Sequence, residues 1–296
     1  MVKCRYFYIF YLTKYYQNII ILLYINLRYV YVKGGKYMKK IISLILSISV
    51  LALLVGCGSK STVASTDTAS SETAAKPKQK LILCTNAEFP PYEYKEGGEY
   101  AGIDIECAKL IGEKLNAEIE IMDIAFDSLI PTIMSGKADF AMAGMTVTED
   151  RLKNVDFTHT YQTAVQTIVV PQNSDITSAD DLSDKKIGVQ TGTTADIYCS
   201  DDFGDEAVER YSKIIDGFQA MKAGKVDACV VDDQVAKAIV AQDGGSFKIL
   251  SSAYAEEEYA IAVKKGNTEL LNKLNNAIDE IKGSGQLLQI INKYIH

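Results

Sequence analysis

Two stretches of the sequence carry one pattern, "SGKADFAM" at residues 135–142 and "AGKVDACV" at residues 223–230. In each, a small residue is followed by Gly, Lys, any residue and Asp, and then by an apolar run. The glycine is typical of a helix that ends in a left-handed residue, and the lysine favours the negative end of the helix dipole. Both stretches therefore predict a helix that turns into a strand. They indicate either two ordinary helix ends or a chain built from two similar lobes.

Strand-like runs alternate with helical patterns on both sides of this repeat. Helical periodicity is clearest in residues 103–115 and 268–281. The strand candidates are residues 81–85, 119–124, 139–143, 166–170, 186–190, 227–231, 247–250 and 259–263. Many of these runs are apolar on both faces, as in mostly parallel sheets that are covered by helices. The predicted fold class is α/β, in which ligands bind beyond the carboxyl ends of strands.

The beginning of the chain differs from the rest. Residues 1–37 hold nine of the 18 tyrosines and no acidic residue. This composition is typical of a non-coding stretch read as protein, so we expect an untranslated or wrongly assigned extension. A genuine apolar leader is the alternative.

A secretory signal is predicted for residues 38–56. Two lysines precede an apolar run at 41–55, which is shorter than the roughly 20 residues of a membrane-spanning helix. The run ends in "LVGC", which resembles a bacterial lipobox with Cys57 as the lipidated residue. Residues 57–79 are rich in Ser, Thr, Ala and Lys and show no apolar periodicity, so they predict a disordered linker.

Charge and cysteine usage narrow the possible functions. Eight of the 31 basic residues and none of the 38 acidic residues precede Cys57, so the formal charge from Cys57 onward is −15. A chain this acidic is poorly suited to nucleic acid. The four further cysteines show no metal-ligand spacing and are expected to be buried free thiols, although export would permit a disulfide. They are Cys84, Cys107, Cys199 and Cys229.

The first polar cluster follows the first repeat, in "AMAGMTVTEDR" at residues 141–151. Gly144 allows close approach of a ligand to the backbone, and Thr148 is a candidate N-cap for a short helix. Arg151 then lies one turn into that helix, where its planar guanidinium suits a carboxylate. The segment predicts an anion site. Alternatively, Arg151 pairs with Glu149 or Asp150 on a surface helix.

Three further clusters are candidates for binding. "GVQTGTTAD" at 188–196 places exposed amides at a helix start, which favours a negative group but is equally typical of a capped helix. Asp232, after a buried strand, either holds an ammonium group or caps the next helix. In "TNAEFPPYEY" at 85–94, two prolines stiffen a turn, so that Phe89 and Phe126 can enclose a side chain or simply belong to the core.

An enzyme is poorly supported by the sequence. It contains two histidines, and no metal-ligand spacing, nucleophile elbow or dinucleotide loop. We expect no catalytic residue, no metal and no cofactor.

Six motifs follow one another along the folded part of the chain. They are "TNAEFPPYEY" (85–94), "AGIDIECAKLIGEKL" (101–115), "FDSLIPTIMSGKADFAMAGMTVTEDR" (126–151), "VDFTHTYQT" (155–163), "KIGVQTGTT" (186–194) and "DACVVDDQVA" (227–236). In this order and spacing, from about Leu81 to Tyr294, the chain resembles family 3 extracellular solute-binding proteins, the amino-acid receptors of ABC importers. The resemblance implies the two-lobed periplasmic-binding-protein fold of the second type. Lobe 1 would comprise residues 80–165 and 258–296, and lobe 2 residues 166–257, with a two-segment hinge.

The resemblance also implies roles for individual residues. Arg151 would clamp the ligand's α-carboxylate, helped by the amides of Gly144 and Thr146 and by Thr194. Asp232, with the Thr146 hydroxyl and carbonyls near Ala143, would hold the α-ammonium group.

The same resemblance places Phe89 and Phe126 as aromatic walls around the ligand side chain, with Asn86 and Gln190 at its tip. It leaves the ligand open among polar and basic amino acids.

Partners follow from the same resemblance. They are an amino acid as the small-molecule ligand, the permease subunits of an ABC importer and the extracytoplasmic face of the cell membrane, reached through a lipid such as palmitate on Cys57. The protein is expected to be a monomer. Dehydratases on the same fold and ligand-sensing modules are the alternatives, and the acid at position 232 disfavours the first.

Overall fold

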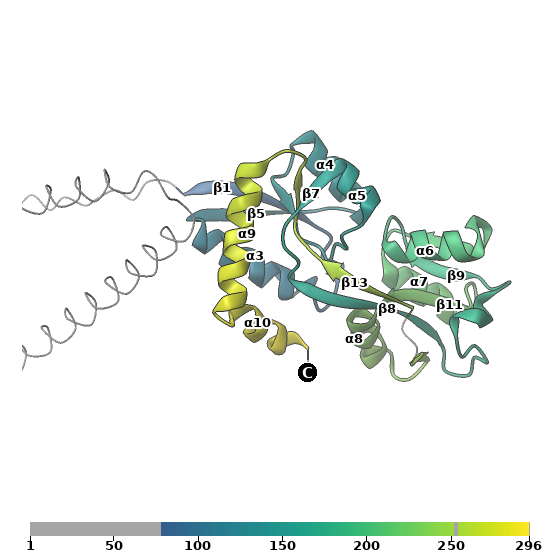
Figure 1. The fold of residues 1–296 in the computed structure, drawn as a ribbon. Helices are drawn as coiled ribbons and strands as arrows, with labels where there is room; N and C mark the ends of the chain where they lie inside the picture. Colours follow the sequence, from purple (N-terminus) through teal and green to yellow (C-terminus); the bar gives the residue numbers. More distant parts are fainter. Residues whose placement is uncertain (1–77, 252–253, 296) are drawn as a thin grey trace, which may run out of the picture. The chain divides into compact units, whose positions relative to one another are not determined.

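The computed structural model describes residues 78–251 and 254–295. The predictions for the N-terminal extension, the signal segment, Cys57 and all but the last two residues of the linker lie outside these residues. The described part forms two lobes, each with its own sheet between helices (Figure 1). The predicted α/β class and two-lobed fold are confirmed.

Lobe 1 is built on a five-stranded sheet in the order β5-β1-β6-β14-β7. The strands are β1 (Gln79–Thr85), β5 (Ala117–Asp123), β6 (Phe140–Ala141), β7 (Val155–Phe157) and β14 (Ala262–Lys264). On β1, Leu81 and Leu83 pack in one core cluster and Ile82 and Cys84 in another, so that both faces of the strand are covered. The helices are α3 (Ile103–Lys114), α4 (Leu129–Ser135), α5 (Glu149–Asn154), α9 (Thr268–Gly283) and α10 (Gln286–Tyr294).

A small antiparallel sheet extends lobe 1. It consists of β2 (Glu88–Phe89), β3 (Glu93–Glu96) and β4 (Glu99–Ala101). In this sheet Phe89 lies opposite Glu93.

Lobe 2 is built on the sheet order β10-β9-β11-β8-β12, with β13 paired to β8. The strands are β8 (Gln162–Pro171), β9 (Ile187–Gln190), β10 (Val208–Tyr211), β11 (Ala228–Asp232), β12 (Phe247–Ile249) and β13 (Ala255–Tyr259). On β11, Ala228 and Val230 lie in one core cluster and Cys229 and Val231 in the other. The helices are α6 (Thr194–Phe203), α7 (Ile214–Lys222) and α8 (Asp233–Asp243).

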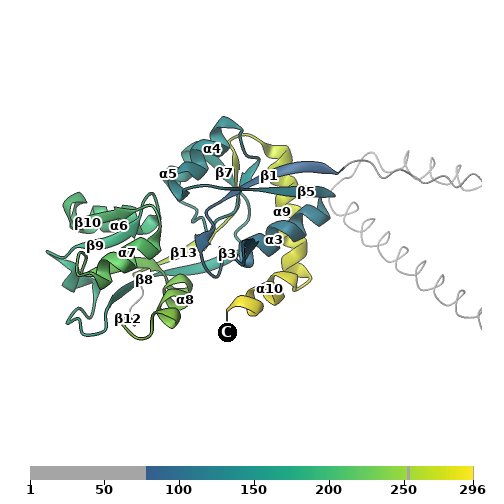
Figure 2. The same cartoon turned by 180° about the vertical axis from the view of Figure 1, so that it is seen from behind.

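Strands β8 and β13 connect the two lobes. They pair antiparallel from Gln166 opposite Ala255 to Gln162 opposite Tyr259, and Figures 1 and 2 show them side by side from one lobe to the other. The strand predicted for residues 259–263 is therefore divided. β13 ends at Tyr259 in the lobe 2 sheet, and β14 begins at Ala262 in the lobe 1 sheet.

The sheets contain less parallel pairing than predicted. Strand β1 is parallel to β5 and β6, and β9 is parallel to β10 and β11. All pairings of β14 and β8 are antiparallel. The physical reason is that the chain passes between the lobes and returns, so each sheet receives a strand that runs against its neighbours.

The repeated sequence pattern forms the same local structure in both lobes. Its glycines, Gly136 and Gly224, are left-handed, with φ of 73° and 70°. The Asp139 carboxylate accepts a hydrogen bond from the Ile82 N–H at 2.7 Å. In lobe 2, Asp227 accepts the equivalent bond from the N–H of Lys186 at 2.8 Å. Each aspartate thus joins its own strand to the next one in the sheet.

The four cysteines of the described residues are free and buried, as predicted. Burial raises the pKa of the Cys84 and Cys199 thiols to about 12, so these groups are protonated at neutral pH. Among the helices of residues 78–251 and 254–295, none is long and apolar enough to cross a membrane.

Removal of the Asp139 carboxylate should destabilise lobe 1. We expect Asp139→Ala to lower the free energy of unfolding by about 1–2 kcal/mol, because the Ile82 amide loses a charge-assisted hydrogen bond. Urea unfolding followed by circular dichroism measures this difference. Glu113→Ala, on the exposed side of α3, is the control and should change it by less than about 0.5 kcal/mol. Equal losses in the two variants would contradict the assigned role.

Candidate functional site

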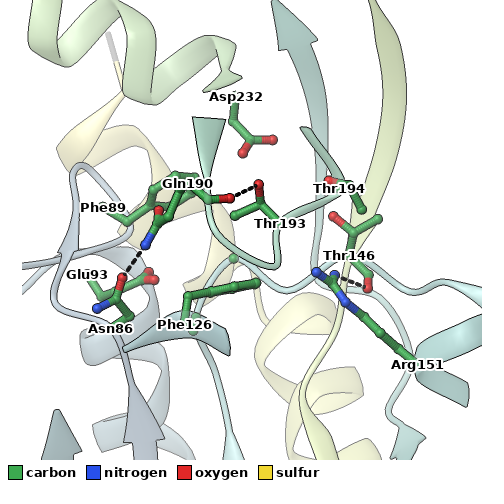
Figure 3. A pocket seen from close by; sticks show the side chains of 12 residues that line it. Asn86, Phe89, Glu93, Phe126, Thr146, Arg151, Gln190, Thr193, Thr194 and Asp232 are labelled. Atoms are coloured by element: carbon green, nitrogen blue, oxygen red, sulfur yellow. Dashed lines mark hydrogen bonds between the residues drawn. The ribbon is translucent and has the colours of Figure 1, made fainter. Parts of the chain in front are cut away.

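One cavity is lined by residues that follow the carboxyl ends of strands β1, β6, β9 and β11 (Figure 3). All ten residues that the sequence predicted for ligand binding lie around it, and Glu93 and Thr193 join them. The lining is Asn86, Phe89, Glu93, Phe126, Ala143, Gly144, Thr146, Arg151, Gln190, Thr193, Thr194 and Asp232. The structure thus brings together candidates from both lobes, and their roles in binding a ligand stay predictions.

Helix α5 positions Arg151. Thr148 is its N-cap, as predicted, and the Thr148 hydroxyl accepts a hydrogen bond from the Arg151 N–H at 3.2 Å. The Arg151 side chain does not pair with the neighbouring acids, since Asp150 forms an ion pair with Lys153 instead. The alternative of a surface ion pair at Arg151 is therefore wrong.

The guanidinium of Arg151 is buried and bound to backbone carbonyls. Its Nη1 donates to the Thr146 carbonyl at 2.8 Å, and its Nη2 donates to the Gly192 carbonyl of lobe 2 at 3.2 Å. The Phe126 ring lies 5.3 Å from the guanidinium carbon. A guanidinium has five N–H groups, so three remain for a planar anion. Burial lowers the pKa of Arg151, but a guanidinium stays charged at neutral pH.

The Gly144 amide is not free to bind a ligand, and the residue instead leaves room for the Phe89 ring. Its N–H donates to Asp104 Oδ2 at 2.8 Å, and the Tyr161 hydroxyl donates to the same oxygen at 2.7 Å. The predicted contribution of the Gly144 amide to an anion seat is thus not available in this structure. Its φ of +52° favours glycine, and an added Cβ would lie 3.1 Å from the Phe89 ring.

Asp232 is a buried acid that does not cap a helix. It precedes α8, but its side chain makes no capping hydrogen bond. Instead, Oδ1 accepts from the Gln166 side-chain amide at 3.0 Å. Burial, followed by the negative charge of Glu257, raises the pKa of Asp232 to about 8. The acid is therefore placed where a cation would stabilise its charged form.

The two polar amides predicted for the tip of the ligand meet across the lobes. Gln190 Nε2 donates to Asn86 Oδ1 at 2.8 Å, and Asn86 Nδ2 donates to the Ile124 carbonyl at 3.0 Å. Nearer the surface, Lys213 of lobe 2 pairs with Glu88 of lobe 1 at 2.6 Å. The lobes thus touch on several sides of the cavity.

Glu93 is a pocket residue that the sequence analysis missed. Only 1% of it is exposed, and within the described residues neither carboxylate oxygen has a hydrogen-bond partner. Burial, followed by the charge of Asp104, raises its pKa well above the usual value. Figure 3 shows Glu93 and Asn86 on one side of the pocket and Arg151 on the other. Glu93 lies opposite Phe89 in the β2–β3 pairing. A sequence analysis that had predicted this hairpin would have placed Glu93 beside the pocket residue Phe89.

Thr193 was also missed, and it shapes the loop before α6. Its hydroxyl donates to the Gln190 carbonyl at 2.8 Å and, as the N-cap, accepts from the Asp196 N–H at 3.3 Å. Thr194, the first residue of α6, lies 3% exposed in the pocket wall. Among the described residues, no group of acids, histidines and cysteines is arranged to hold a metal ion.

Comparison with known proteins places this geometry in a family. Residues 81–296 match the model of bacterial extracellular solute-binding proteins, family 3. The chain belongs to this family, whose members are solute-binding proteins rather than enzymes.

Relatives include curated proteins and solved structures. The chain is 34% identical to the arginine-binding extracellular protein ArtP of Bacillus subtilis, over 87% of this chain and 98% of ArtP. It is 29% identical to the glutamine-binding protein GlnH of the same organism, over 87% and 98%. The structure of an ancestral arginine-binding protein bound to arginine is 40% identical, with a TM-score of 0.71 over 74% of this chain and 99% of that one.

The raised pKa of Asp232 predicts a pH dependence of stability. In the unfolded chain Asp232 ionises near its ordinary value of 3.8, whereas in the folded protein it holds its proton up to about pH 8. The folded state therefore binds more protons in this window, and the free energy of unfolding falls as pH rises through it. Urea unfolding without added ligand at pH 5 to 8 should show this slope. Asp232→Asn should reduce this slope to the part that other buried acids such as Glu93 contribute, and Asp233→Asn should leave it unchanged. Equal slopes in the two variants would refute the assignment.

Proposed function

We propose that this protein is the extracytoplasmic substrate-binding subunit of an ABC importer and binds an L-amino acid with a cationic side chain. The observation that carries the proposal is the set of buried ionisable groups in the pocket, one guanidinium at Arg151 and two carboxyl groups at Asp232 and Glu93. A zwitterion neutralises Arg151 and Asp232. A further positive charge on the ligand would stabilise the ionised form of Glu93, whose pKa is raised by burial and by the charge of Asp104.

The α-carboxylate belongs at Arg151. Three guanidinium N–H groups remain after the two bonds to carbonyls, enough for both oxygens of a carboxylate. The Thr146 N–H, which has no acceptor within residues 78–251 and 254–295, and the Thr194 hydroxyl complete the seat. The start of α6 adds the positive end of a helix dipole.

The α-ammonium group belongs at Asp232 and the Thr146 hydroxyl, with carbonyls near Ala143 as further acceptors. A bound ammonium group would stabilise the ionised form of Asp232, whose pKa is raised by burial. This pairing sets the α-carbon between lobe 1 and lobe 2.

The ligand side chain would extend between Phe89 and Phe126 toward Glu93, with Asn86 and Gln190 at its tip. A guanidinium or ammonium head satisfies the two unpartnered oxygens of Glu93. A neutral amide head, as in glutamine, is the second candidate, because Asn86 and Gln190 both carry amides that pair with it. Relatives named for arginine and for glutamine are consistent with either head.

Capture would occur by closure of the two lobes. Ligand contacts from Arg151 on one side and Asp232 on the other stabilise the closed form, since the open form makes only one set. Lobe 1 comprises residues 80–165 and 258–296, lobe 2 residues 166–257, and strands β8 and β13 are the hinge. The closed monomer then docks on the permease, held at the membrane by a lipid on Cys57.

Ligand binding should depend on Arg151. A thermal-shift screen of the common amino acids is expected to give the largest increase in Tm with L-arginine or L-lysine. Arg151→Ala should weaken L-arginine binding by about 100-fold or more, because a buried carboxylate loses its partner at a cost of about 3–5 kcal/mol. Titration calorimetry measures the change, with Lys153→Ala on the same helix as control. A loss below about tenfold would exclude Arg151 as the clamp.

Glu93 should determine whether the protein prefers a ligand with a cationic or with a neutral side chain. We expect Glu93→Gln to weaken L-arginine binding by about tenfold or more and L-glutamine binding by less than about threefold, because only the cationic head needs the carboxylate. Glu96→Gln, at an exposed position of the same strand, should leave both affinities unchanged. Unchanged L-arginine binding by Glu93→Gln would refute the cationic ligand.

A further inference from the structure

Glu257 is a buried acid behind the pocket. It lies on the crossing strand β13, is 5% exposed and is not part of the cavity lining. Its Oε2 accepts from the Thr146 hydroxyl at 2.9 Å and from the Gln166 side-chain amide at 3.1 Å. Its Oε1 has no partner within the described residues. The Glu257 carboxylate thus contacts Thr146 of lobe 1 and Gln166 of strand β8, the second strand that crosses between the lobes.

The hydrogen bond to Glu257 determines whether the Thr146 hydroxyl acts as a donor or as an acceptor toward the cavity. A threonine hydroxyl carries one proton and two lone pairs. That proton is donated to Glu257 Oε2. The hydroxyl oxygen is left as an acceptor, which suits an ammonium group and disfavours a carboxylate.

Glu257 fixes the Gln166 amide in the same way. The nitrogen of Gln166 donates to Asp232 at 3.0 Å and to Glu257 at 3.1 Å, which uses both of its protons. The amide nitrogen of Gln166 therefore faces the two acids, and its oxygen faces away. The longer contact from this nitrogen to the Thr194 hydroxyl, at 3.4 Å, is the weakest of the set.

We propose that Glu257 is a positioning residue that orients a bound zwitterion. It binds the Thr146 proton, so that the Thr146 oxygen can accept from the ligand, and it holds the Gln166 amide nitrogen toward Asp232. This inference rests on the proposed function. The α-ammonium group of the ligand then meets two oxygens, Asp232 Oδ and Thr146 Oγ1, with the charge of Glu257 behind them. The α-carboxylate is excluded from that side and lies at Arg151.

Replacement of Glu257 by glutamine removes the negative charge behind the ammonium site without changing the side-chain volume. The glutamine oxygen can still accept from Thr146 and Gln166, but its amide nitrogen can equally turn toward either of them, so their orientation is no longer fixed. Recognition of the ammonium group should suffer, while recognition of the carboxylate and of the side chain should not.

The test compares two probes by titration calorimetry, L-arginine and 5-guanidinopentanoic acid, which lacks only the α-ammonium group. Glu257→Gln should weaken L-arginine by about tenfold or more and change 5-guanidinopentanoic acid by less than about threefold. L-glutamine and its analogue without the α-ammonium group provide the same comparison for a neutral side chain. Glu256→Gln, the neighbouring exposed acid of β13, is the matched control and should change neither probe.

A second variant distinguishes the proposed role of Glu257 from a general disturbance of local packing. Thr146→Val should show the same selective loss, and in the double variant the two losses should not add, because they remove one interaction. Equal weakening of both probes by Glu257→Gln, or no weakening, would overturn the role of Glu257. If the wild-type protein bound no amino acid at all, the proposed function itself would fail, and the inference with it.

Discussion

The buried charges around the pocket are not paired with one another. Arg151 donates to backbone carbonyls, Asp232 accepts from a neutral amide, and Glu93 has no hydrogen-bond partner in the part of the chain that the structure describes. Burial without a counter-charge disfavours the charged forms, and it raises the pKa of both acids. In the proposed function, a ligand that carries the missing charges would be stabilised by groups that are already buried and oriented.

The proposed coupling between ligand binding and closure rests on which lobe holds each of these groups. Arg151 and Thr146 belong to lobe 1, and Asp232 and Thr194 follow strands of lobe 2. Contacts such as Arg151 with the Gly192 carbonyl join the lobes directly. The remaining support comes from β8 and β13, so the hinge strands carry part of the hydrogen-bond network as well as the connection. In the proposed mechanism, a movement of these strands would therefore also change the arrangement of the site.

The candidate site could be predicted well where its residues follow strands in recognisable motifs. Gly144, Arg151 and Asp232 were found in this way because parallel strands bring their carboxyl ends to one edge, whereas Gln190 was placed by the resemblance to the family. The amide of Gly144 was assigned wrongly, since its acceptor, Asp104, lies 40 residues away in the sequence. The sheets were expected to be mostly parallel because many strands are apolar on both faces. This pattern shows that a strand is buried, but it does not show in which direction the neighbouring strand runs.

The sequence by itself determined the α/β class, the helix ends at the repeated glycines and the strand ends that carry ten of the twelve pocket residues, since each depends on local conformation and strand order. Only the tertiary structure decided which acids are buried. Glu93 and Glu257 are surrounded in sequence by exposed glutamates of the same kind. Burial, and with it the hydrogen bonds and the pKa of each acid, is decided by the distant segments that pack against it, which no local pattern contains.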